Sequence, residues 1–104
     1  MALKTKPFDP SKYLDDDAAV ALYLDEALAT NDGGVVAACL GDVARARGMT
    51  QLAKDAGLTR ASLYKALSAD GNPELSTVLR VLQALRLKLT AVPSAAAART
   101  NSTN

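Results

Sequence analysis

The chain contains no histidine and no tryptophan, and its only cysteine is Cys39. General acid–base and thiol chemistry most often use a histidine, so Cys39 has no imidazole to activate it. The sequence also lacks a glycine-rich phosphate-binding loop and a pair of carboxylates at a spacing useful for catalysis. These absences argue against an enzyme, and we expect neither a cofactor nor a bound metal.

Long hydrophobic runs and secretion signals are missing as well. No stretch approaches the roughly 20 apolar residues that a membrane-spanning helix needs. The amino terminus, MALKTKPF, lacks the apolar centre of a secretory signal. A single cysteine cannot form an internal disulfide, which suits a reducing compartment. We therefore expect a cytoplasmic protein without membrane contact.

Aromatic residues are scarce, with three tyrosines and one phenylalanine among 104 residues. Alanine, leucine and valine dominate the apolar residues, and the first two favour helices, whereas strands favour aromatic and β-branched residues. A chain of this length has room for one domain with a modest core. The sequence thus predicts one all-α domain at 15–92, between an amino-terminal arm at 1–14 and a flexible tail at 93–104.

The formal net charge of +1 conceals a division along the chain. Residues 1–42 carry three lysines against eight carboxylates, a net charge of −5. Residues 43–104 carry nine lysines and arginines against three carboxylates, a net charge of +6. Such asymmetry favours a second half that meets a polyanion and a first half that meets a different partner, although two ordinary solvated surfaces would also explain it.

Two helices are predicted in the first half. Aspartates 15–17 precede an apolar stripe at helical spacing, made of Val20, Leu24, Ala27 and Leu28. These carboxylates suit helix capping better than metal binding, because consecutive residues of a helix point in different directions. The residues NDGG at 31–34 break the pattern, and the second helix has an apolar face of Val36, Cys39, Leu40, Val43 and Ala44. Within that face, Cys39 is expected to be a packed thiol.

The segment that follows Gly48 has the spacing of a helix-turn-helix motif. Thr50 is expected to cap a short helix at 51–56, and Thr59 a second one from Arg60 to about Ser68. Between them Gly57 supplies the positive φ of a tight turn, and Ala53 is small where the helices cross. The residues expected to point inward are Leu52, Leu58, Leu63 and Leu67. Those left on the outer face are Arg60, Ala61, Tyr64 and Lys65.

An inert helical hairpin is the alternative to DNA binding for this segment. Residues 43–67 carry five basic residues against Asp55, a local charge of +4. Arg60 also stands at the exposed start of a helix, where the macrodipole disfavours a cation. A phosphate or a guanine edge would compensate that placement, so the sequence favours binding to double-stranded DNA.

The last part of the domain is a loop, a helix and an ambiguous segment. Gly71 permits the turn, Asn72 is a candidate cap and Pro73 suits the first position of a helix. The expected core face of that helix is Leu75, Val78, Leu79, Leu82 and Leu85. Residues 86–92 alternate polar and apolar side chains, which fits a short strand across a dimer axis or a packed tail.

Several motifs, taken in order, resemble the addiction-module antidote proteins, which are antitoxins of lambda-repressor-like helix-turn-helix (HigA-like) type. The similarity covers nearly everything from Phe8 to Leu89, and its motifs are FDPSKYL at 8–14, YL at 23–24, AL at 27–28, GDVARARGM at 41–49, GLTRASLYKAL at 57–67 and DGNP at 70–73. One departure is Arg86, which stands where the family usually has a glycine that caps the last helix.

This resemblance implies a five-helix lambda-repressor-like domain, with room for a short carboxy-terminal strand. It also implies an antitoxin of a type II module that neutralises a RelE/HigB-like toxin and, as a homodimer, represses its own operon. The acidic first half is a plausible surface for a basic toxin. A stand-alone phage or chromosomal repressor, or a helical module that binds only proteins, are the alternatives.

The positions within the motif assign roles to nine candidate DNA-binding residues. Arg60 and Ala61, at the start of the recognition helix, are expected to contact base edges, guanine and a thymine methyl respectively. One turn later, Tyr64 and Lys65 would reach a base or a phosphate, although Tyr64 is alternatively a core residue. The remaining phosphate candidates are Thr50, Gln51, Thr59, Ser68 and Asn72. The last helix and residues 87–92 are the expected dimer surface.

Overall fold

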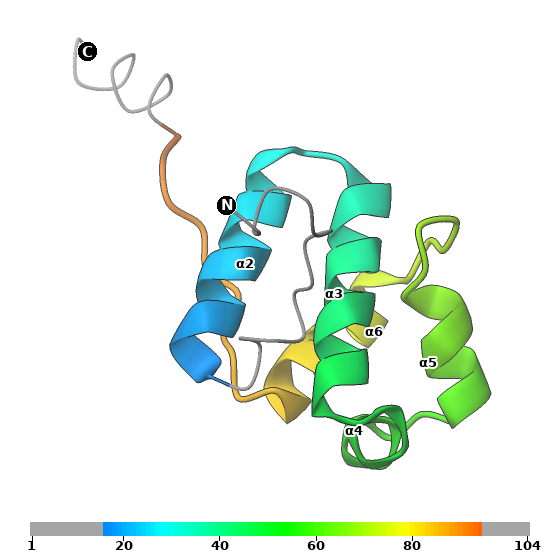
Figure 1. The fold of residues 1–104 in the computed structure, drawn as a ribbon. Coiled ribbons are helices and arrows are strands. Elements are labelled where there is room, and N and C mark those ends of the chain that lie inside the picture. Colours follow the sequence, from blue (N-terminus) through cyan, green and yellow to red (C-terminus); the bar gives the residue numbers. More distant parts are fainter. Residues whose placement is uncertain (1–15, 95–104) are drawn as a thin grey trace, which may run out of the picture.

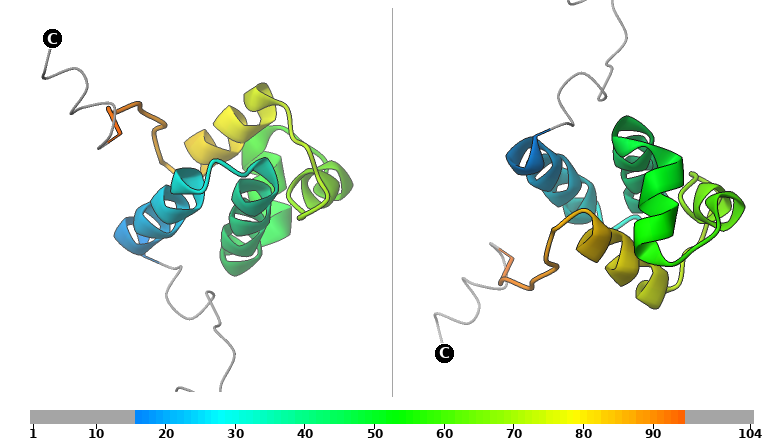
Figure 2. Two further views of the ribbon diagram at one scale, coloured as in Figure 1. Left: turned by 90° about the horizontal axis from the view of Figure 1, so that it is seen from above. Right: turned by 90° about the horizontal axis from the view of Figure 1, so that it is seen from below.

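A computed structural model of the chain describes residues 16–94, which form five helices and no strand. In chain order the helices are α2 (Asp17–Ala29), α3 (Gly33–Arg47), α4 (Met49–Ala56), α5 (Arg60–Ala66) and α6 (Leu75–Ala84). In Figures 1 and 2, α2 and α3 form an antiparallel hairpin, α5 lies on the opposite side of α3, and α6 packs behind. The predicted all-α fold is confirmed, and the arrangement is compatible with a helix-turn-helix domain. Residues 1–15 and 95–104, which hold the predicted arm and most of the predicted tail, lie outside the described residues.

Aspartate side chains begin both helices of the hairpin, as the sequence predicts for α2. The Asp16 carboxylate accepts a hydrogen bond from the Ala18 amide at 3.1 Å, and that of Asp32 accepts from the Gly34 amide at 2.9 Å. The break between the two helices is shorter than the predicted 31–34, because Gly33 and Gly34 already belong to α3. Leu28 was also misplaced in the apolar stripe, since its side chain is 42% exposed.

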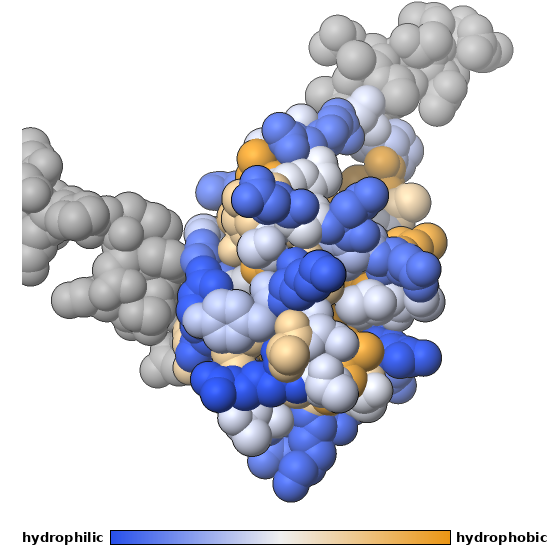
Figure 3. Space-filling view, turned by 90° about the vertical axis from the view of Figure 1, so that its right-hand side faces the viewer, coloured by the Kyte–Doolittle hydropathy of each residue, from blue (hydrophilic) through white to orange (hydrophobic). Residues whose placement is uncertain are grey.

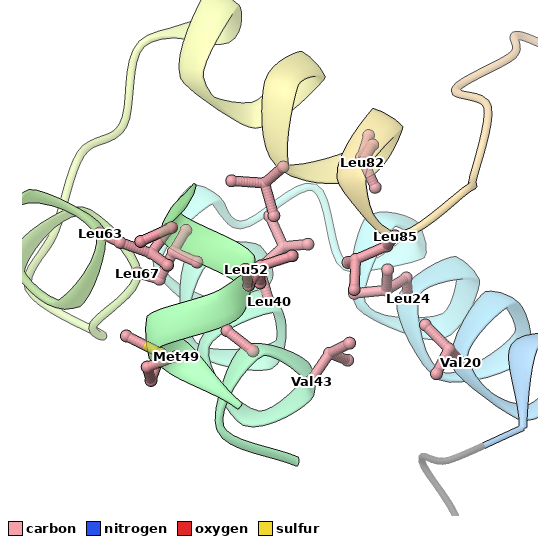
Figure 4. Close-up of a cluster of buried hydrophobic side chains, with 13 residues drawn as sticks. Val20, Leu24, Leu40, Val43, Met49, Leu52, Leu63, Leu67, Leu82 and Leu85 are labelled. Atoms are coloured by element: carbon pink, nitrogen blue, oxygen red, sulfur yellow. The ribbon is translucent and has the colours of Figure 1, made fainter. Parts of the chain in front are cut away.

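One core joins all five helices, and Figure 4 shows its side chains converging between them. Leu63 of α5 and Leu67, the residue after α5, are almost completely buried. Val81 of α6 and Leu85, the residue after α6, complete the core. The thirteen buried residues of the cluster are Val20, Leu24, Leu40, Val43, Ala44, Met49, Leu52, Ala53, Leu63, Leu67, Val81, Leu82 and Leu85. Because α5 contributes its inner residues to this core, its opposite face must point outward.

Polar contacts also join the two helices of the hairpin. The Tyr23 hydroxyl donates to Asp42 at 2.6 Å, and burial together with this hydrogen bond raises the pKa of Tyr23. The Arg47 guanidinium donates to Asp17 at 2.7 Å and lowers the pKa of that carboxyl. Cys39, half-buried on the same side of α3, is consistent with the predicted packed thiol.

The predictions for α6 and the residues after it were partly wrong. The helix begins at Leu75 after Glu74, so Asn72 is not its cap and Pro73 is not its first residue. Its buried face is Val81, Leu82 and Leu85, whereas Leu75 and Leu79 are 65% and 45% exposed. Residues 86–92 form no strand in the described part of the chain.

Arg86 ends α6 in a left-handed conformation with φ 63°. Its amide donates to the Gln83 carbonyl at 2.9 Å, and the Leu87 amide donates to the Leu82 carbonyl at 2.8 Å. These two hydrogen bonds form the Schellman motif, which usually places glycine at the left-handed position. The helix thus ends where a glycine would end it, but with the steric cost of a Cβ atom.

We expect Arg86→Gly to stabilise the protein by about 0.5–1 kcal/mol, because it removes the strain of a left-handed residue with a Cβ atom. The greater conformational entropy of glycine in the unfolded chain offsets only part of this gain. The lost contact with Asp17 spans 3.9 Å between exposed groups and contributes little. Urea unfolding measures the change, with Asn31→Gly as the control. Asn31 also has a positive φ, 57°, but asparagine tolerates it, so no gain is expected there. A destabilised Arg86→Gly protein would contradict the prediction.

Candidate nucleic-acid interface

The candidate interface is built on α4, the turn after it, and α5. Helix α4 begins at Met49 after Gly48, whose φ is 103°, and no side chain caps it. The predicted capping role of Thr50 was therefore wrong, since Thr50 lies one residue inside the helix and is exposed. The inner face of α4 is anchored by Met49, Leu52, Ala53 and Ala56, all of which are buried.

The predicted turn is confirmed at Gly57, whose φ is 73°. Its amide donates to the Lys54 carbonyl at 3.1 Å, and the Leu58 amide donates to the Ala53 carbonyl at 2.8 Å. This Schellman motif stops α4 and lets the half-buried Leu58 side chain pack against the core. The chain then starts α5 only three residues later.

Helix α5 is capped and oriented as the sequence predicts. The Thr59 hydroxyl oxygen accepts from the Ser62 amide at 3.0 Å. The buried side chains of Leu63 and Leu67 hold the inner face against the core, although the helix ends at Ala66, two residues early. The four residues of the outer face line one shallow depression of the surface: Arg60, Ala61, Tyr64 and Lys65. Tyr64 is 49% exposed and is thus not a core residue.

Figure 3 shows this side of the molecule, where hydrophilic side chains surround a few less polar ones. We refer to Arg60, Ala61, Tyr64 and Lys65 as the α5 face. Their mixture of two cations, a methyl group and an aromatic ring matches the groups that read phosphates, base edges and thymine methyls. The sequence placed all four residues together, and the structure brings them together.

The charges near the motif are distributed differently from what the sequence suggests. Arg45 pairs with Asp42 at 2.6 Å, and Arg47 pairs with Asp17 at 2.7 Å, so two of the five local cations already have acidic partners. Among the described residues, no carboxylate forms an ion pair with Arg60 or Lys65. Of the three local cations without an ion pair in the described residues, Arg60 and Lys65 lie on the α5 face, and Lys54 is exposed on α4.

The other predicted contacts lie around this face in less favourable settings. Thr50 and Gln51 are exposed on the first turn of α4, but the Gln51 amide donates to Asp55 at 2.9 Å. Ser68 and Asn72 line a neighbouring hollow beyond the end of α5, which Lys65, Asp70 and Glu74 also line. The Ser68 hydroxyl also donates to the Lys65 carbonyl at 3.1 Å. The structure thus does not bring Ser68 and Asn72 onto the α5 face.

Two glycines hold the end of α5 in place, and the sequence pattern assigned this role to neither of them. A Cβ atom on Gly41 of α3 would overlap the Leu67 carbonyl oxygen, and one on Gly71 would overlap the Ala66 carbonyl oxygen. Both glycines let backbone approach the end of α5 closely. A helical glycine that is buried in an otherwise apolar stripe is the only hint of this contact in the sequence.

Neither a membrane span nor a metal cluster is found in residues 16–94. No helix there is long and apolar enough to cross a bilayer. No group of three or more histidine, cysteine or acidic side chains in that range is placed to hold a metal ion.

Comparison with known proteins identifies the family. Residues 4–93 match the family model described as probable addiction module antidote protein. The chain belongs to this family. An uncharacterized protein of Haemophilus influenzae is 44% identical to this chain over 88 residues, which cover 85% of the chain and 91% of the relative. No solved structure gives a significant match.

Membership of this family implies a toxin as a partner of this chain. An antidote acts by binding, so it needs a surface that recognises the toxin in addition to any surface that meets DNA. The α5 face occupies one side of the domain, which leaves the side formed by α2 for other contacts (Figures 1 and 2).

Proposed function

We propose that the protein is a DNA-binding antitoxin of a type II toxin-antitoxin module, of lambda-repressor-like (HigA-like) type. It represses its own operon through the α5 face and neutralises a RelE/HigB-like toxin in the cytoplasm. The observation that carries the DNA-binding role is the pair of exposed cations, Arg60 and Lys65, on the outer face of α5, with which no carboxylate among residues 16–94 forms an ion pair.

The start of α5 enters the major groove in this proposal, while α4 crosses the sugar-phosphate backbone. Arg60 donates two hydrogen bonds to a guanine, and Ala61 contacts a thymine methyl group. Tyr64 and Lys65 lie one turn later and meet a base or a phosphate. Thr59 uses its oxygen as an acceptor in the helix cap, so its hydroxyl hydrogen can still be donated to a phosphate.

A homodimer completes the site, because a single module of this size buries too little of the groove for tight, specific binding. Two recognition helices about 34 Å apart would reach successive major grooves on one side of the duplex. The exposed leucines of α6, Leu75 and Leu79, support this helix as the dimer contact. Large apolar side chains of this kind are commonly covered in an assembly.

Gel-shift titration against the DNA upstream of its own gene tests the proposal. We expect a dissociation constant of about 10⁻⁸ M or tighter, and an affinity at least about 10³-fold above that for random DNA at the same salt concentration. The toxin role is tested by adding the antidote to a translation assay that the neighbouring RelE/HigB-like protein inhibits. Equal affinity for both DNAs would remove the repressor role, and continued inhibition would remove the antitoxin role.

A further inference from the structure

An apolar groove runs between α2 and the chain that follows α6. We refer to it as the α2 groove, and its main apolar lining is Ala21, Leu22, Leu28, Leu82, Leu87 and Leu89. A second hollow without polar lining continues it between α2, α3 and α6, and the two hollows share Leu24, Leu28, Leu82 and Leu89. The apolar surface is therefore continuous across α2, α3, α6 and the segment after α6.

Large side chains remain exposed along this groove. Leu22 is 63% exposed, Leu28 is 42% exposed and Leu89 is 40% exposed. Single exposed leucines are common, but several gathered in one hollow indicate a surface that another molecule covers. The groove thus has the apolar centre of a protein-binding site.

The rim of the groove is acidic on the side of α2. This helix carries Asp17, Asp25 and Glu26 and no basic residue. Asp25 lines the groove, Glu26 follows Leu22 by one helical turn, and no basic residue of the described chain forms an ion pair with either. Lys88 is the cation of the lining, on the opposite wall. A partner that fits has apolar side chains surrounded by basic residues.

The position of the groove favours a different protein over a second copy of this chain. The views of Figures 1 and 2 agree that α2 and residues 88–94 lie on one side of the domain and α5 on the other. A two-fold contact through the α2 groove would point the two α5 faces in opposite directions, so one duplex could not meet both. A heterologous partner on this side leaves the α5 face open to DNA.

We infer that the α2 groove is the surface on which the antidote binds its toxin, a protein with apolar side chains inside a basic rim. The inference rests on the proposed antitoxin function and adds the place and chemistry of the contact. Because the α2 groove and the α5 face are on opposite sides, toxin and DNA can be bound at the same time.

The test measures affinity for the purified RelE/HigB-like protein encoded beside the antidote, using the full chain. Leu22→Glu places a charge at the centre of the groove on an exposed helical position, where glutamate favours the helix. We expect it to weaken toxin binding about 30-fold or more, as for a central contact residue, and to leave DNA binding unchanged. Val35→Glu is the matched control, because Val35 is exposed near the start of α3 and lines neither hollow.

A charge-reversed double variant, Asp25→Lys with Glu26→Lys, is expected to slow association and to weaken the dependence on salt. Toxin binding within threefold of wild type for Leu22→Glu, or an equal loss for Val35→Glu, would overturn the inference. A Leu22→Glu protein that sediments as a monomer while wild type sediments as a dimer would overturn it in favour of a second copy. Absence of binding by the wild type would instead refute the antitoxin function itself.

Discussion

Arg60→Ala is expected to weaken binding to the operator by about 1–3 kcal/mol, or roughly 5- to 150-fold in dissociation constant. Arg60 stands at the exposed start of α5 and has no ion pair within the described residues. In the proposed complex it donates both arms of its guanidinium to one guanine. Gel shifts with the operator and with random DNA, at one salt concentration, measure the effect.

Two matched variants separate base reading from simple loss of charge. Arg86→Gly removes the same charge next to α2, on the side away from α5, and is expected to retain operator affinity within about twofold. Arg60→Lys retains the charge but loses the bidentate geometry, so it is expected to lose most of the preference for the operator. If Arg60→Ala weakened operator and random DNA equally, Arg60 would be a phosphate contact and the base reader would lie elsewhere.

Gly41→Ala is expected to destabilise the fold by about 3 kcal/mol, at the upper end for overpacked sites, because the atom that the new Cβ meets belongs to the backbone. That atom is the carbonyl oxygen of Leu67, at the end of α5. The helix must move away from α3 to make room. Thermal unfolding should show a midpoint lower by roughly 12 °C or more.

Gly33→Ala provides the matched control in the same helix. Nothing lies within 4 Å of a Cβ atom on Gly33, so alanine is expected to stabilise α3 by up to about 1 kcal/mol. The two substitutions are chemically identical and should change stability in opposite directions. An unchanged midpoint for Gly41→Ala would mean that α3 and the end of α5 are not in contact.

The sequence predicted the local features of α4, the turn after it and α5 well. The turn at Gly57, the cap at Thr59 and the inward side chains of Leu63 and Leu67 all follow from spacing within one short stretch. Caps and turns depend on residues three to five positions apart, and their geometry is set before any tertiary contact forms. The same locality explains why the outer α5 face could be named in advance.

Predictions that depended on the orientation of a whole helix were less successful. Helix α6 offers two apolar faces, and the sequence pattern does not say which one meets the core. Val81 is buried, whereas Leu75 and Leu79 are exposed, because α4 packs against only one side of α6. Of the two alternatives at 86–92, a short strand or a packed tail, the strand does not form in the described chain, since alternation alone cannot provide a neighbouring strand.

The sequence alone determined that the chain forms helices and bends between α4 and α5. It also determined which side chains of α5 point outward, namely Arg60, Ala61, Tyr64 and Lys65. Only the tertiary structure decided which charges remain available, because Arg47 finds Asp17 thirty positions away in the chain. The tertiary structure also decided that Leu75 and Leu79 are exposed, and that Gly41 cannot be replaced by a residue with a Cβ atom without a clash. Those properties arise from contacts between distant segments, and no local spacing encodes them.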